Sequence, residues 1–156
     1  GDMWIPAVFS VFESCRVSAA FAGRGGHGAF SDHTGTISMW RCVEHGGALQ
    51  EPVLLAKVRL TADSNPRNQR ILCALSVSFS PDTPSDTTSG ALGQSNAHPI
   101  WVFGDEHGIL YLASVAGCMQ RMEAHKGKVL CLEDVSAKSP SGSFGQPVLV
   151  LSSGAD

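Results

Sequence analysis

Apolar and polar residues alternate over short runs along this chain, and turns containing glycine or proline separate the runs. No window keeps apolar residues at helical spacing, whereas 17 glycines and 8 prolines divide the chain into short pieces. This pattern predicts an all-β protein. We expect strands near residues 17–22, 28–31, 36–42, 53–60, 71–79, 100–104, 108–114, 118–123, 128–134 and 147–152.

One hairpin unit recurs among these strands. It joins a short apolar strand, through a polar turn, to a second strand of alternating residues. The unit is found in segments 28–40, 102–113 and 148–156. Its turn glycines are Gly35 and Gly108, and Asp156 stands where the residue before a third such glycine would fall. Self-similarity at this scale predicts a repeat architecture.

The repeat divides the chain into two four-stranded units and half of a third. Their expected bounds are 1–69, 70–124 and 125–156. Polar insertions are expected at 83–99 and 136–147, between the first and second strands, and at 43–52, between the third and fourth. In an antiparallel sheet these connections leave from one end, so we expect one elaborated face and one trimmed face. Because the third unit stops in mid-repeat, we expect a fragment of a larger protein.

Composition narrows the class of protein. A net charge of −3 and a pI of about 6.0 leave no basic face for phosphates, so nucleic acid is not favoured as a partner. No run approaches the roughly 20 apolar residues that span a bilayer, and no membrane association is expected. The five cysteines lack C-x-x-C spacing, which predicts reduced thiols, with Cys73 and Cys131 in core strands. An intracellular location, cytoplasmic or nuclear, follows.

Several residues in this pattern resemble the WD-repeat β-propeller family, whose unit is four antiparallel strands over roughly 40–45 residues. The turn from Phe79 to Asp82, Phe-Ser-Pro-Asp, is similar to the turn that ends a first strand in that family. Phe21 precedes Gly35 by fourteen residues, which is the family's usual interval. The resemblance covers essentially the whole chain and implies part of a propeller made of four-stranded blades.

The resemblance also assigns positions within each repeat. Trp40 stands where the closing Trp of the family belongs, although Arg41 replaces the Asp that should follow, and Thr34 occupies the place of the turn Asp. His125 stands at the family's loop His. The structural repeat positions marked in this way are Phe21, Gly35, Trp40, Phe79, Asp82, Gly108, His125 and Asp156.

In the best-formed members of the family, the loop His, a Ser or Thr, the turn Asp and the Trp form a buried hydrogen-bonded network. In the third repeat the resemblance implies His125 with Ser152 or Ser153. The second repeat has His107 and Ala113 in the Asp and Trp positions, so it is not expected to form the usual network. We expect this divergent repeat to do without it.

The segment from Gly23 to Gly28 matches the G-x-G-x-x-G pattern of dinucleotide-binding loops and follows an apolar strand. A phosphate site of that kind needs a helix that begins at the glycines, but the residues that follow alternate as a hairpin does. A turn with positive φ is therefore predicted, and no cofactor. Histidines beside acidic residues, such as His33, His45 and His107, have no third group that would complete a catalytic or metal site, so neither is predicted.

Propellers present function through loops and surfaces while the sheets position them. The sequence therefore predicts a protein-interaction scaffold that is not an enzyme and whose partners are other proteins and the remaining blades of its parent chain. The alternative is a regulatory or sensor propeller attached to an enzyme or a nucleotide-dependent protein. Trp101 is expected to be a packing residue, with an exposed partner-binding role as its alternative.

Overall fold

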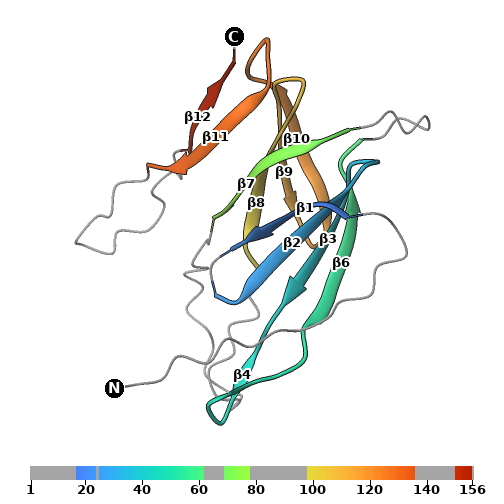
Figure 1. Cartoon of the computed structure of the whole chain (residues 1–156), viewed down its shortest axis with the longest axis vertical. Helices are drawn as coiled ribbons and strands as arrows, with labels where there is room; N and C mark the ends of the chain where they lie inside the picture. The colour runs from blue at the N-terminus through green and yellow to red at the C-terminus, as the bar shows by residue number, and fades with distance from the viewer. Residues whose placement is uncertain (1–16, 24, 62–68, 78–97, 136–149, 156) are drawn as a thin grey trace, which may run out of the picture.

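The structure, a computed structural model, is an all-β protein and describes residues 17–23, 25–61, 69–77, 98–135 and 150–155 (Figure 1). Three of the residues that the family resemblance marks, Phe79, Asp82 and Asp156, lie outside the described residues. The insertion 136–147 and most of the insertion 83–99 also lie outside them.

Two four-stranded antiparallel sheets and two hairpins contain all the described strands. The first sheet has the order β1 (Val17–Ala22), β2 (His27–Asp32), β3 (Thr36–Arg41), β6 (Val53–Arg59). The second consists of β7 (Ile71–Val77), β8 (Ile100–Asp105), β9 (Ile109–Ser114) and β10 (Gly117–Glu123), paired in chain order. The hairpins are β11 (Val129–Asp134) with β12 (Val150–Gly154), and β4 (Glu44–His45) with β5 (Ala48–Leu49).

Alternation along the strands decides which residues form the core between the first two sheets. On β2 and β3, Ala29, Ile37 and Met39 point to one face and are almost fully buried. They pack against Phe103 and Tyr111 of the second sheet. Burial of this apolar surface, at roughly 25 cal/mol per Å², holds the two sheets face to face.

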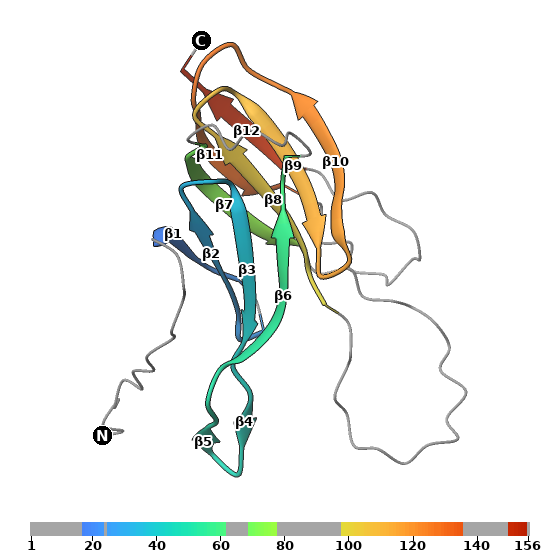
Figure 2. The ribbon, with the colours of Figure 1, turned by 90° about the vertical axis from the view of Figure 1, so that its right-hand side faces the viewer.

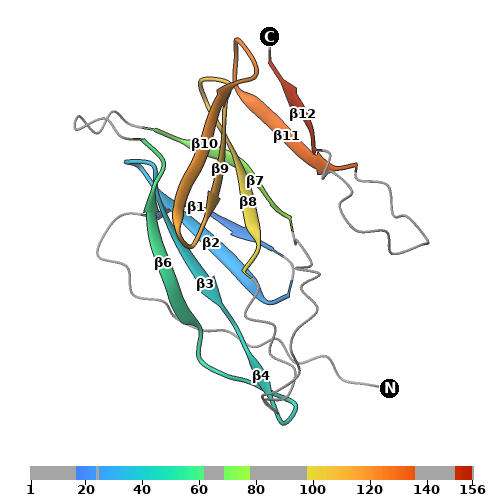
Figure 3. The same cartoon turned by 180° about the vertical axis from the view of Figure 1, so that it is seen from behind.

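The opposite face of the second sheet forms a second core. Val102 and Leu110 pack there against Val129 and Leu132 of β11. The sheets therefore form an open stack in which β7 lies between β1 and β11 (Figures 1 and 3). On another side of the stack, β6 and β10 lie side by side as the outermost strands of their sheets (Figure 3).

Connections leave the stack at two distinct ends. Gly23, after β1, lies against Trp101 at the start of β8, where an added Cβ would be 2.7 Å from the indole ring. The rings of His27 and His98 meet at the same end, with centroids 6.0 Å apart. The β4–β5 hairpin also projects there, beyond the first sheet (Figure 2). The short β2–β3 and β8–β9 turns lie at the opposite end.

The glycine segment after β1 forms a hairpin turn. Gly25 and Gly26 have φ values of 64° and 75°, a left-handed conformation that glycine adopts at little steric cost. The strand β2 begins directly after them, at His27, where a dinucleotide-binding loop would begin a helix. The match to G-x-G-x-x-G therefore arises from a tight turn and from the close approach of Gly23 to Trp101.

Candidate interaction surfaces

Two equivalent aspartates organise the β2–β3 and β8–β9 turns. Asp32 Oδ1 accepts hydrogen bonds from the backbone N–H groups of the residues two and four positions later, at 2.8 and 3.0 Å. Asp105 Oδ1 accepts the same pair of bonds in the next sheet, both at 2.9 Å. The interval between the two aspartates equals the interval between Gly35 and Gly108, so they hold the same place in the two repeats. Each carboxylate thus fixes its turn from inside the loop.

The turn glycines allow close approach by the residues that lead into the following sheet. Gly35 and Gly108 have φ values of 78° and 84°. A Cβ on Gly35 would collide with the Gln69 side chain, and one on Gly108 with the carbonyl oxygen of His125. The Gly108 carbonyl in turn accepts hydrogen bonds from the N–H groups of Ala124 and His125, both at 3.0 Å. Each turn is thereby attached to the residues that lead into the following sheet.

The second sheet contains a buried polar network that sequence reasoning missed. Asp105 Oδ2 accepts hydrogen bonds from the Tyr111 hydroxyl at 3.1 Å and from Gln69 Nε2 at 3.2 Å, and Gln69 Nε2 also donates to the Tyr111 hydroxyl oxygen. Asp105 and Tyr111 are almost inaccessible to solvent. Burial, followed by the charge of Asp105, raises the pKa of Tyr111 to about 12, although contact with Arg121 acts in the opposite direction.

The second repeat was not expected to form the usual network of the family, and the network observed there is built from other residues. The family register directs attention to His107 and Ala113, whereas the network uses Asp105 and Tyr111, each two residues earlier. The signal available in the sequence is the aspartate at the same place in both repeats. The contribution of Gln69 could not be predicted from the sequence, because it depends on the path of the chain from β6 to β7.

In the third repeat, His125 Nε2 lies 2.9 Å from Ser152 Oγ, so Ser152 is the partner among the two serines that the resemblance implied. Gly154 makes room for the imidazole, because a Cβ there would meet the His125 ring. In the first repeat, Trp40 Nε1 is buried and has no hydrogen-bond partner among the described residues. Trp40 instead meets Phe30 edge to face, with ring centroids 6.5 Å apart.

Trp101 is confirmed as a packing residue. It is 1% exposed and stacks on Phe103 with centroids 5.8 Å apart, so the alternative of an exposed partner site is wrong.

The expectation that Cys131 lies in the core is wrong, because this cysteine is exposed on β11. Cys73 is half-buried, and burial followed by the nearby Cys131 raises its pKa to about 11. The four described cysteines are free thiols.

The outer face of the first sheet carries an apolar hollow. It is lined by Ala20, Phe21, Ala22, Gly23, Gly26, His27, Gly28, Phe30, Trp40, Cys42, Leu49 and Pro52. Phe30 and Trp40 hold the places in the first repeat that Phe103 and Ala113 hold in the second, on the face that packs against the first sheet. The hollow is therefore the counterpart of a face that is buried elsewhere in the same molecule.

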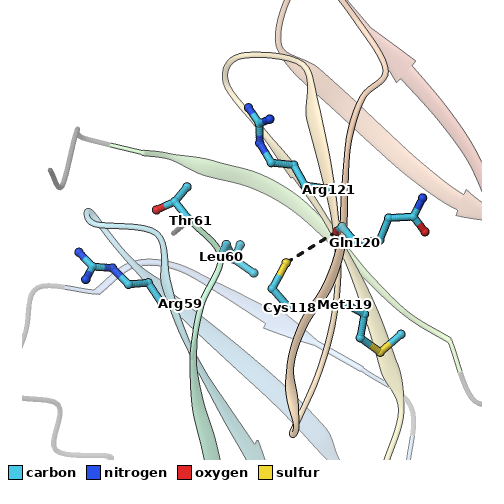
Figure 4. A pocket seen from close by; sticks show the side chains of 7 residues that line it. All are labelled: Arg59, Leu60, Thr61, Cys118, Met119, Gln120 and Arg121. Carbon is cyan, nitrogen blue, oxygen red and sulfur yellow. Dashed lines mark hydrogen bonds between the residues drawn. The ribbon is translucent and has the colours of Figure 1, made fainter. Parts of the chain in front are cut away.

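A groove between the outermost strands is the second surface feature (Figure 4). It encloses about 760 Å³, and its lining comes from the end of β6, the two residues after it, and the middle of β10. The lining residues are Arg59, Leu60, Thr61, Cys118, Met119, Gln120 and Arg121. Two guanidinium groups border it, and none of the described residues that line it carries a carboxylate, so this described lining is cationic in a chain of net charge −3.

Chemically reactive clusters are not found in the described part of the chain. No group of three or more His, Cys, Asp or Glu residues there could hold a metal ion. His107 Nε2 lies 3.7 Å from Glu106 Oε1, but its side chain is 65% exposed and no third described group joins the pair.

Within the described ranges, no helix has the length and apolar character to cross a bilayer. Comparison with protein-family models, curated proteins and solved structures finds no match.

Proposed function

We propose that this chain supplies blades of a WD-repeat-like β-propeller that binds other proteins and catalyses no reaction. The observation that carries the proposal is the uniform stacking of the sheets. The first strand of each sheet lies beside the first strand of the next, and the same face of each sheet looks back toward its predecessor. Radial repetition of antiparallel four-stranded sheets is the defining geometry of a propeller.

The turn chemistry supports the same proposal. Asp32 and Asp105 build the same turn in successive sheets, and Gly35 and Gly108 are both closed by residues that lead into the following sheet. In a repeat protein each unit contacts its neighbours in the same way, and stability comes from those nearest-neighbour contacts. A rigid stack of this kind suits a scaffold, because it holds loops and edges in fixed relative positions.

Site-specific photo-cross-linking in cells tests the binding role. A benzophenone amino acid is placed at Leu49, which is 49% exposed in the β4–β5 hairpin. It is also placed at His107, whose side chain is 65% exposed in the β8–β9 turn. We expect adducts with other proteins, more from position 49 than from position 107. The absence of protein adducts from both positions would argue against a scaffold.

A further inference from the structure

Strands β6 and β10 each have one unpaired edge in the described part of the chain. β6 pairs with β3 and β10 pairs with β9, and neither has a second neighbour there. Edge strands present backbone N–H and C=O groups to which an extended chain can align. Six of the seven residues of β10 are exposed, so no described element covers this strand.

The groove between these edges combines an apolar surface with positive charge. Leu60 is buried at its floor, and Met119 stands 54% exposed on β10, at the shift in register between Cys118 and Gln120. Flexible Met side chains adapt to the shape of a bound chain. In Figure 4, Arg59 lies at one side of the groove and Arg121 extends from β10. Neither forms a salt bridge with a described carboxylate.

The charge pattern narrows the class of ligand. A nucleic acid or an anionic membrane is attracted by a broad basic surface. The described lining of this groove carries only two guanidinium groups. Two guanidinium groups beside an apolar floor match one or two carboxylates on a chain that also carries apolar side chains. Arg is well suited to this contact because its planar group can bind a carboxylate through two hydrogen bonds.

We propose that the groove between β6 and β10 binds an extended peptide segment of a partner protein, with its acidic side chains at Arg59 and Arg121 and an apolar side chain on Met119. The inference rests on the proposed scaffold function and specifies the chemistry of one partner. The segment lies along the exposed edge of β10, so recognition depends on alternating acidic and apolar residues rather than on a folded surface.

Fluorescence anisotropy with synthetic peptides tests this proposal on the whole chain. The probe is a fluorescein-labelled peptide in which three valines alternate with two glutamates, and the matched peptide has lysines in place of the glutamates. We expect saturable binding of the glutamate peptide, weakened by added salt, and at least about tenfold weaker binding of the lysine peptide. Equal affinity for both peptides, or no binding of the glutamate peptide, overturns the proposal.

Variants locate the site. Arg59→Ala should weaken binding of the glutamate peptide about tenfold, and Arg59→Glu should abolish it. Arg70→Ala removes the same charge from an exposed arginine outside the groove and should leave the affinity unchanged. Because Arg121 contacts Tyr111, Arg59 is the primary test and Arg121→Lys the second. Unchanged affinity in Arg59→Ala, with native thermal unfolding, contradicts the proposal.

Hydrogen exchange separates this inference from the scaffold function. We expect slower exchange at the β10 amides in the presence of the glutamate peptide and no change in β2 or β3. If the peptide does not bind while Leu49 still forms protein adducts, the groove proposal fails and the scaffold function stands. If the peptide does not bind and Leu49 forms no protein adducts, the groove proposal and the scaffold function both fail.

Discussion

Asp105 occupies a position at which a single side chain holds three elements together. Its Oδ1 fixes the β8–β9 turn, and its Oδ2 accepts hydrogen bonds from Tyr111 on β9 and from Gln69 before β7. A buried carboxylate is tolerated only when its oxygens are satisfied, since an unpaired buried charge is costly. The turn, the sheet and the lead into that sheet therefore depend on one another at this residue.

Tyr111 offers a direct measurement of this network, because it is the only tyrosine of the chain. We expect an absorbance titration of tyrosinate to have its midpoint near pH 12 in the folded chain and near pH 10 in denaturant. The folded pKa is the higher one, so the stabilisation is complete below about pH 10 and is lost as the pH rises toward 12. A midpoint near 10 under native conditions would contradict the buried network.

Tyr111→Phe should remove the hydrogen bond to Asp105 and destabilise the chain by about 1–3 kcal/mol at pH 7. The variant should also lose the part of the stability that varies between pH 10 and 12. Chemical denaturation at several pH values measures both effects. A variant with unchanged stability at neutral pH would show that the hydroxyl is not engaged.

Comparing Gly108→Ala with Gly46→Ala separates two costs of adding a side chain: the strain of a positive φ and the collision of the Cβ with a neighbouring segment. Both glycines have positive φ, but an added Cβ meets nothing within 4 Å at Gly46 and collides with the His125 backbone at Gly108. We expect Gly46→Ala to cost about 1 kcal/mol and Gly108→Ala clearly more, measured as free energies of unfolding. Equal costs would indicate that the turn does not contact the next repeat.

Among the elements, strands with a short apolar run between turns were predictable and the short exposed ones were not. The segment 71–79 was expected as a strand, and its described residues, Ile71–Val77, form β7. The strand expected at 28–31 lies within β2. Short runs of apolar residues bounded by turn signals are typical of strands. The β4–β5 hairpin was expected only as a polar connection. Its strands have two exposed residues each, so no buried face marks them in the sequence.

The candidate surfaces were less predictable than the strands. Arg59 and Arg121 are far apart in the sequence, and only the stacking of the first two sheets brings β6 beside β10. Trp40 was marked by a family pattern, yet its indole nitrogen makes no hydrogen bond to a described residue. Local periodicity predicts strands, whereas a groove between sheets depends on their tertiary arrangement.

Replacing residues 44–49 with two glycines tests whether the β4–β5 hairpin is an independent appendage. Its described strand pairing is internal, and Gln50 N–H already bonds to the Val43 carbonyl at its base, at 2.8 Å. We expect the free energy of unfolding to change by less than about 0.5 kcal/mol. A larger loss in thermal or chemical denaturation would mean that the hairpin packs on the sheets.

At the scale of the whole molecule, two phenylalanines at equivalent positions meet different surroundings. Phe103 is fully buried between the sheets and lies edge to face with Phe21, at 6.2 Å between centroids. Phe30, its counterpart in the first repeat, faces the hollow on the outer face of the first sheet. If further blades pack on that face, as the proposed propeller requires, the surroundings of Phe30 become those of Phe103.

Phe103→Ala should therefore destabilise this chain by about 3–5 kcal/mol, whereas Phe30→Ala should cost about 1 kcal/mol or less. Denaturant titration gives both values, and hydrogen exchange should show that Phe103→Ala weakens protection in both sheets together. Similar costs for the two substitutions would contradict the assignment of the Phe30 face as one that no other described sheet covers.

The closing of each turn by the next repeat also sets an order for assembly on the ribosome. Gly35 is covered by Gln69, and Gly108 by His125, so each hairpin receives its last contacts from residues translated after it. We expect a nascent sheet to become protease-resistant only when the residues that precede the first strand of the next sheet have left the ribosomal exit tunnel. Folding would then follow synthesis with a lag of one unit.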